Sequence, residues 1–239
     1  MIAENLRQIR TSLPAGVSLV AVSKFHPVER LMEAYDAGQR LFGENRPQEL
    51  AAKAPQMPAD VQWHFIGHLQ TNKLKLVLPY VTMVQSVDSF HLLEAINNWC
   101  TANSKTVDIL LELHLGAEET KSGFTEEEIL SIIYAADAFK ASRVGKGLSE
   151  AKEVSEGVPA ALSNVRIRGL MGMATNTDDK DVVEADFARI EALFNKIKAL
   201  GIPGFDQLSI GMSGDWPLAV RRGATMVRIG TDIFGPREY

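Results

Sequence analysis

Residues 17–24, with the sequence Val-Ser-Leu-Val-Ala-Val-Ser-Lys, form a mostly apolar segment that stops at a single lysine. Such an uninterrupted apolar run is typical of a strand buried on both faces, as in a parallel sheet. Alternation along a strand places Lys24 on the same face as Val20 and Val22. In parallel α/β folds the C-terminal strand ends carry the chemistry, so Lys24 stands where a functional residue is expected.

An amine held among apolar side chains is desolvated, which lowers its pKa and makes it a better nucleophile for a carbonyl carbon. The segment therefore raises the hypothesis that Lys24 forms a Schiff base. The alternative is a strand-end lysine whose charged head reaches solvent. Taken alone, the segment favours a solvent-exposed Lys24, and evidence from the rest of the chain is needed to distinguish the two interpretations.

Strand and helix patterns alternate along the whole chain after an amphipathic helix over residues 1–13. Thr125 and Glu128 form a capping box, and the clearest helix pattern, over residues 182–200, ends at Gly201. Residues 107–115 are the longest strand candidate, whereas residues 140–164 read as an exposed loop or irregular helix. The pattern predicts an α/β protein, a single TIM-like (β/α)8 barrel with an extra N-terminal helix in one domain over residues 1–239. Its strands are expected at residues 17–24, 41–45, 61–67, 81–87, 107–115, 165–173, 206–211 and 226–230.

Composition narrows the classes of partner and location. The chain has 239 residues, with 25 Lys and Arg against 30 Asp and Glu, so a basic surface for nucleic acid is not expected. Neither a secretory signal nor an apolar run of membrane-spanning length is present in the sequence. Cys100 is the only cysteine and cannot form an intrachain disulfide. We expect a cytoplasmic protein, working as a monomer, with no nucleic-acid or membrane partner.

Polar residues follow several of the expected strands, and a barrel would bring these strand ends into one ring. The clearest are the last two, where residues 209–215 and 228–231 place small residues and hydroxyls at apparent helix starts. Such positions favour an anion, and barrels frequently bind phosphate after strands seven and eight. Ser213 could instead only cap a helix, and Gly230 only turn the chain. Together with Lys24 on the adjacent first strand, however, they indicate pyridoxal phosphate.

Three competing motifs are incomplete. Asp215 stands where the nucleophile elbow of a serine hydrolase needs its last glycine. His64 and His68 are four residues apart, but in a strand rather than in the helix of a zinc motif. Residues 145–147 lack the third glycine and the preceding strand of a dinucleotide fingerprint. We expect no metal site, no serine triad and no nicotinamide cofactor.

Six segments resemble the pyridoxal phosphate homeostasis proteins, which are barrels similar to the N-terminal domain of bacterial alanine racemase. They lie in the right order, and the resemblance covers nearly the whole chain, except that residues 140–164 look longer than the family pattern. The segments are residues 21–24 (AVSK), 42–45 (FGEN), 63–67 (WHFIG), 70–73 (QTNK), 208–213 (LSIGMS) and 226–231 (MVRIGT).

The resemblance implies a role for each candidate site residue. Lys24 would form the internal aldimine, and Arg228 would face the pyridine nitrogen. Ser213, Gly230 and Thr231, with help from Ser209, would hold the phosphate. The ring pocket would be lined by Asn45, His64, Ile66 and Met173.

A guanidinium only donates hydrogen bonds, so Arg228 would keep the pyridine nitrogen unprotonated and weaken the ring as an electron sink. We therefore expect a protein that binds pyridoxal phosphate and serves vitamin B6 homeostasis, or delivers the cofactor to pyridoxal phosphate-dependent apoenzymes. The alternative is an enzyme acting on amino acids, such as a racemase. Racemisation needs acid/base groups on both faces, and the racemases that the chain resembles take the second, a tyrosine, from a β domain for which we expect no counterpart. A third, weaker reading is a phosphate-binding enzyme that uses Lys24 without the cofactor.

Overall fold

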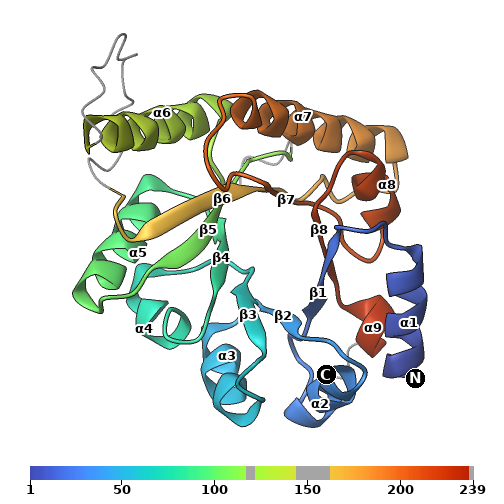
Figure 1. Ribbon diagram of the computed structural model, residues 1–239. Helices are drawn as coiled ribbons and strands as arrows, with labels where there is room; N and C mark the ends of the chain where they lie inside the picture. Colours follow the sequence, from blue (N-terminus) through green and yellow to red (C-terminus); the bar gives the residue numbers. More distant parts are fainter. Residues whose placement is uncertain (117–121, 144–161, 237–239) are drawn as a thin grey trace.

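The computed structural model describes residues 1–116, 122–143 and 162–236. Its parallel strands close into a barrel in sequence order, with β1 paired to both β2 and β8 (Figure 1). The predicted α/β barrel is therefore confirmed. The strands are β1 (Ser18–Val22), β2 (Leu41–Glu44), β3 (Gln62–Phe65), β4 (Met83–Val87), β5 (Val107–Glu112), β6 (Val165–Met171), β7 (Gln207–Ser209) and β8 (Met226–Ile229).

Helices surround the barrel, and a helix or helical turn follows each strand up to β8 (Figure 1). The extra N-terminal helix, α1, is present as predicted. The helices are α1 (Ile2–Ser12), α2 (Val28–Asp36), α3 (Pro47–Lys53), α4 (Leu74–Val77), α5 (Phe90–Ala102), α6 (Glu126–Arg143), α7 (Lys180–Lys198), α8 (Trp216–Arg221) and α9 (Thr231–Phe234), with 3-10 turns η1 (Ala54–Gln56) and η2 (Thr71–Lys73).

The capping box at the start of α6 is confirmed. The Thr125 backbone N–H donates to the Glu128 carboxylate at 2.8 Å, and the Glu128 N–H donates to the Thr125 hydroxyl at 3.2 Å. These two bonds satisfy donors that a helix N-terminus leaves open. The helix then continues through Arg143, so residues 140–143 are helical, which is one of the two forms expected for the segment over residues 140–164. The rest of that segment, from residue 144 to residue 161, lies outside the described residues, and so do residues 145–147.

The longest strand of the described residues is β6 and not β5, which was expected to be the longest over residues 107–115. β5 ends at Glu112 after six residues, whereas β6 has seven. The register of this pair shifts between Ile109 and Leu110, opposite Gly169. A Cβ built on Gly169 would lie 1.7 Å from the Gln207 backbone oxygen, so the close approach of β6 and β7 requires a glycine there.

Apolar side chains pack in two places. One large cluster lies between the barrel and its helices, and it includes Cys100, which is buried as a core residue. A smaller cluster fills the barrel interior, with Val20, Met83 and Met226 among its members. Because alternate residues of each strand point inward, side chains fill the interior in layers. The inward-facing positions closer to the C-terminal strand ends lie above this apolar cluster and are occupied by polar side chains such as Arg228 and Glu112.

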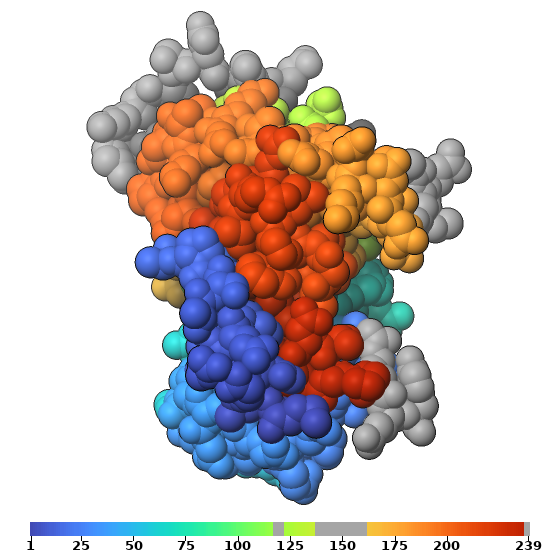
Figure 2. Space-filling model, turned by 90° about the vertical axis from the view of Figure 1, so that its right-hand side faces the viewer, coloured from blue at the N-terminus to red at the C-terminus, as the bar shows by residue number. Residues whose placement is uncertain are grey.

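The two ends of the described chain lie side by side. Figure 2 shows the blue N-terminal segment against the red C-terminal one, and the Asn5 side-chain amide donates to the Ile233 backbone oxygen at 3.0 Å. α1 thus packs beside α9, the last helix after the closing strand. Within the described ranges, no helix has the length and apolar character needed to cross a membrane.

Candidate ligand-binding site

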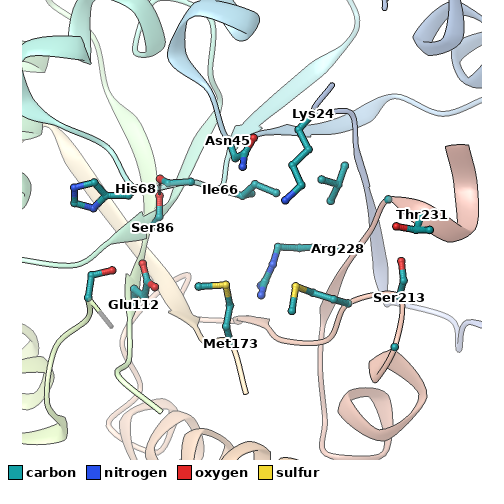
Figure 3. Close-up of a pocket in the computed structure, with 16 residues that line it drawn as sticks. Lys24, Asn45, Ile66, His68, Ser86, Glu112, Met173, Ser213, Arg228 and Thr231 are labelled. Carbon is teal, nitrogen blue, oxygen red and sulfur yellow. Dashed lines mark hydrogen bonds between the residues drawn. The ribbon is translucent and has the colours of Figure 1, made fainter. Parts of the chain in front are cut away.

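A pocket of about 400 Å³ opens at the C-terminal ends of the barrel strands. Its lining comes from segments distant in the sequence, as expected for a barrel that gathers its strand ends (Figure 3). The lining residues are Val22, Lys24, Asn45, Ile66, Gly67, His68, Ser86, Glu112, Ser122, Met173, Met212, Ser213, Gly214, Arg228, Gly230 and Thr231.

Eight of the ten residues that the sequence singles out are among these lining residues, and they surround the cavity from several sides. Lys24 extends from one wall toward the middle of the pocket, with Arg228 opposite and Met173 at the lower side (Figure 3). Ser213 and Thr231 lie together at one end (Figure 3). The eight are Lys24, Asn45, Ile66, Met173, Ser213, Arg228, Gly230 and Thr231.

His64 and Ser209 are not among the residues that line this pocket, although His64 was expected at the ring and Ser209 near the phosphate. His64 lies on β3, two residues before Ile66, which directly follows the strand, so His64 points inward one layer deeper in the barrel. Ser209 is fully buried, and its hydroxyl donates to the Gln85 side-chain oxygen at 2.6 Å. Both residues are buried beside the lining residues, and each forms a hydrogen bond with Gln85.

A continuous chain of buried side chains crosses the barrel interior beneath the pocket. The Gln85 amide donates to His64 Nδ1 at 2.8 Å, and Ser209 joins Gln85 to Arg228. Arg228 Nη1 donates to the Ser209 hydroxyl at 2.6 Å and to its backbone oxygen at 2.8 Å, while Nη2 donates to the Gly172 oxygen at 2.9 Å. Three acceptors therefore hold the guanidinium in one plane at the pocket floor.

Burial sets the charge of the groups in this layer. It lowers the pKa of His64 to about 3, so the imidazole is neutral at physiological pH and its Nδ1 accepts the Gln85 hydrogen bond. It also lowers the pKa of Arg228 to about 10, although the carboxylates of Glu112 and Asp215 act in the opposite direction. Arg228 therefore remains a cation, and it faces the cavity as a hydrogen-bond donor only.

Glu112 is a pocket residue that the sequence analysis missed. It ends β5, is 5% exposed and lies beside Ser86 and His68 at the end of the cavity away from Ser213 (Figure 3). Burial and the nearby Asp88 carboxylate raise its pKa to about 7, while Arg228 opposes the rise. Its position at a strand end was the available signal, because it is two residues after the inward-facing Leu110.

The end of the pocket around Ser213 and Thr231 consists of small residues and hydroxyls. Gly214 and Gly230 contribute backbone without side chains, and a Cβ on Gly230 would come within 3.2 Å of the Val22 oxygen. Asn45 adds a further polar group, because its side-chain oxygen is buried without a hydrogen-bond partner among the described residues. The pocket can thus offer an amine, a guanidinium, two hydroxyls and an open acceptor to one ligand.

Comparison with known proteins places the chain in a family. The model of the alanine racemase N-terminal domain matches residues 1–145 and 138–238. The pyridoxal phosphate homeostasis protein of Vibrio alginolyticus is 36% identical over 231 residues, which cover 95% of this chain and 89% of the relative. The corresponding protein of Escherichia coli is 33% identical over 252 residues, covering 100% of this chain and 97% of the relative.

Solved structures agree with the sequence relatives. PipY of Synechococcus elongatus, determined with pyridoxal phosphate bound, is 34% identical and has a TM-score of 0.80, covering 98% of this chain and all of that one. An alanine racemase of Clostridium difficile, at 12% identity and a TM-score of 0.72, shares the fold and covers 100% of this chain but 60% of its own. By its sequence and its barrel, the chain belongs to the family of pyridoxal phosphate homeostasis proteins.

Proposed function

We propose that this chain binds pyridoxal 5′-phosphate reversibly through Lys24 and takes part in the homeostasis or delivery of vitamin B6. The observation that carries the proposal is the meeting of Lys24, Arg228 and the Ser213 and Thr231 hydroxyls in one pocket. PipY, with pyridoxal phosphate bound, has the same barrel at 34% identity, which supports the choice of ligand.

The residues present fit this ligand in charge and hydrogen-bonding capacity. When bound, pyridoxal phosphate supplies an aldehyde that condenses reversibly with an amine. Lys24 would provide that amine, and the aldehyde oxygen would leave as water when the C=N bond forms. Ser213, Gly230 and Thr231 would bind the phosphate through hydroxyl and backbone N–H donors.

The ring would lie between the two ends of the pocket. Arg228, held in plane from below, would donate to the pyridine nitrogen and exclude a proton from it. Asn45, Ile66 and Met173 would line the ring, and the open Asn45 oxygen would accept a hydrogen bond from a ligand donor. Ser209 and His64 would act indirectly, because Ser209 orients Arg228 and His64 anchors Gln85.

The test is covalent trapping at Lys24. Purified protein is incubated with pyridoxal phosphate, reduced with borohydride and digested, and the pyridoxyl adduct is located by peptide mass. We expect the adduct on the Lys24 peptide and its loss in Lys24→Ala, with thermal unfolding confirming that the variant is folded. Native protein that gains no adduct, or an unchanged adduct in Lys24→Ala, would refute the proposal.

A racemase-like enzyme would exchange the α-proton of an added amino acid, whereas a protein that only binds the cofactor would not. Loaded protein is therefore incubated with single L-amino acids in deuterated water. We expect no enzyme-like α-proton exchange, and rapid exchange or formation of D-amino acid would identify a racemase-like enzyme instead.

The proposal extends to organisation and location. We infer one domain over residues 1–239, which the pairing of β1 with β8 supports, and a cytoplasmic monomer that passes the cofactor to apoenzymes. Sedimentation analysis tests the monomer, and reactivation of an apoenzyme by loaded protein tests delivery. A stable dimer, or reactivation no faster than with free cofactor, would contradict these points.

A further inference from the structure

Lys24 lies in a turn, two residues beyond the last residue of β1. The sheet therefore no longer fixes its backbone, although the Ser23 N–H still donates to the Gly43 oxygen of β2 at 3.0 Å. The next residue, Phe25, has a φ of +67°, a left-handed conformation that L residues with a large side chain rarely adopt. Something other than strand pairing must hold this turn.

Both peptide groups that flank Lys24 are bound by side chains of α3. Lys53 Nζ donates to the Ser23 backbone oxygen, which belongs to the peptide before Lys24, at 2.9 Å. The Phe25 N–H, which belongs to the peptide after Lys24, donates to the Glu49 carboxylate at 2.9 Å. The backbone of Lys24 is thus held from both sides by residues outside the barrel.

The two supporting side chains are themselves joined. Lys53 Nζ lies 2.7 Å from Glu49 Oε2 and 2.7 Å from Glu44 Oε1, while the Ser23 hydroxyl donates to the same Glu44 oxygen at 2.8 Å. Glu44 is completely buried, and Lys53 is 7% exposed. Glu44 Oε2 has no partner among the described residues, so the buried carboxylate is held through Oε1 alone, and removal of Lys53 by itself would leave a buried charge unpaired.

We propose that Lys53 and Glu49 are positioning residues that hold the Lys24 turn in the conformation in which the lysine amine faces the ligand pocket. This inference rests on the proposed function, since it concerns how Lys24 meets an aldehyde. The network uses a lysine, with three donors on a compact head, to reach a backbone oxygen and two carboxylates at once. Its members lie outside the pocket lining, so they act on Lys24 without touching the ligand.

The consequence is kinetic and specific to bond formation. A ligand's ring and phosphate meet Arg228, Ser213 and Thr231, none of which depends on α3. Attack by Lys24 on the aldehyde carbon, in contrast, depends on where the turn places the amine. Displacement of a reacting group by about 1 Å can slow a reaction by about 100-fold, so loosening the turn reduces the rate of Schiff-base formation more than it reduces binding.

Two variants separate this role from general stability. Glu49→Ala removes the acceptor of the Phe25 N–H at a partly exposed site and leaves Lys53 paired with Glu44. The double variant Lys53→Met/Glu44→Gln removes the buried lysine together with its buried counter-charge. Lys105→Met is the matched control, because Lys105 is also a partly buried lysine that donates to backbone oxygens, those of Leu78 and Pro79, away from Lys24.

Each variant is measured for the rate of Schiff-base absorbance with pyridoxal phosphate and for affinity toward 4′-deoxypyridoxine phosphate, which has the ring and phosphate but no aldehyde. We expect both Lys24-turn variants to form the Schiff base at least about tenfold more slowly, with unchanged affinity for the analogue and an unchanged rate in the Lys105→Met control.

A native rate in folded Glu49→Ala refutes the inference, as does an equal loss of analogue affinity or an equal loss of rate in the control. If the double variant does not fold, Glu49→Ala decides alone. Native protein that binds the analogue but forms no Schiff base refutes the proposed function and this inference together, whereas a native Schiff base with unaffected variants refutes only the positioning role.

Discussion

Glu112 is buried at the end of the pocket away from Ser213, and its replacement by glutamine gives a quantitative test of the electrostatics there. The substitution keeps the shape of the protonated carboxyl and removes its ability to ionise. Burial and Asp88 raise the Glu112 pKa from 4.5 to about 7, with Arg228 opposing them. The folded protein therefore binds this proton more tightly than the unfolded chain does.

The sign and size of the effect follow from proton linkage. A carboxyl whose pKa is raised on folding contributes stability below its unfolded value, and that contribution is lost as pH rises through the folded value. Each pKa unit corresponds to about 1.4 kcal/mol, so the difference between 4.5 and about 7 amounts to about 3 kcal/mol. Between pH 4.5 and pH 8, the free energy of unfolding of native protein should therefore fall by about 3 kcal/mol relative to that of Glu112→Gln.

Urea unfolding of ligand-free protein at pH 5, 6, 7 and 8 measures the difference. We expect nearly equal free energies of unfolding at pH 5 and a Glu112→Gln variant that is more stable by about 2 to 3 kcal/mol at pH 8. Glu94→Gln, at an exposed site on α5, is the control and should show no such gain. Parallel pH profiles for native protein and Glu112→Gln would refute the assignment of a raised Glu112 pKa.

Two further substitutions test the barrel interior. Ser209→Ala removes one acceptor of the Arg228 guanidinium and the donor to Gln85, so it should lower the free energy of unfolding by about 1 to 3 kcal/mol in urea titrations; an unchanged value would show that the buried chain contributes no stability. Gly169→Ala places a Cβ against the Gln207 backbone oxygen and should lower the free energy of unfolding by about 1 to 3 kcal/mol, which thermal scans would show as a Tm lower by several degrees. A Tm equal to that of native protein would mean that β6 and β7 can separate there without cost.

The barrel was predictable because its signals are local. Apolar runs such as residues 17–24 indicate buried strands wherever they lie, and the Thr125 and Glu128 pair marks a helix start within four residues. The extent of β5 was not predictable, because its apolar character continues beyond Glu112 while its ladder ends there. Strand ends depend on the stagger between neighbours, which the sequence does not display.

The sequence predicts which strand ends meet at the candidate site, but it does not predict how deep in the barrel each side chain lies. Lys24, Arg228 and Ser213 follow strands that a barrel brings together, and the structure places them around one cavity. His64 and Ser209 also point inward, yet one layer lower. Alternation identifies the face of a strand on which a side chain lies, whereas its height in the barrel depends on the tilt and register of the strands.

The support for Lys24 had no recognisable signal. Glu49 and Lys53 are four residues apart on a helix, which is the usual spacing of a solvent-exposed ion pair. The burial of Lys53 follows from the docking of α3 on the turn after β1, a contact between segments about 30 residues apart. Only the folded structure shows that the pair binds backbone atoms beside Lys24.

The buried hydrogen-bond network beneath the pocket also affects when the site forms during folding. It joins β3 and β4 to β7 and β8, so residues 64 and 85 meet residues 209 and 228 only after most of the polypeptide has been arranged. Contacts of such long sequence separation require the closure of large loops, whose entropic cost makes them slow to form. The floor that holds Arg228 is therefore complete only when the last strand docks, and a nascent chain released before β8 would have the lysine but no finished site. Ligand binding thus reports on closure of the whole barrel.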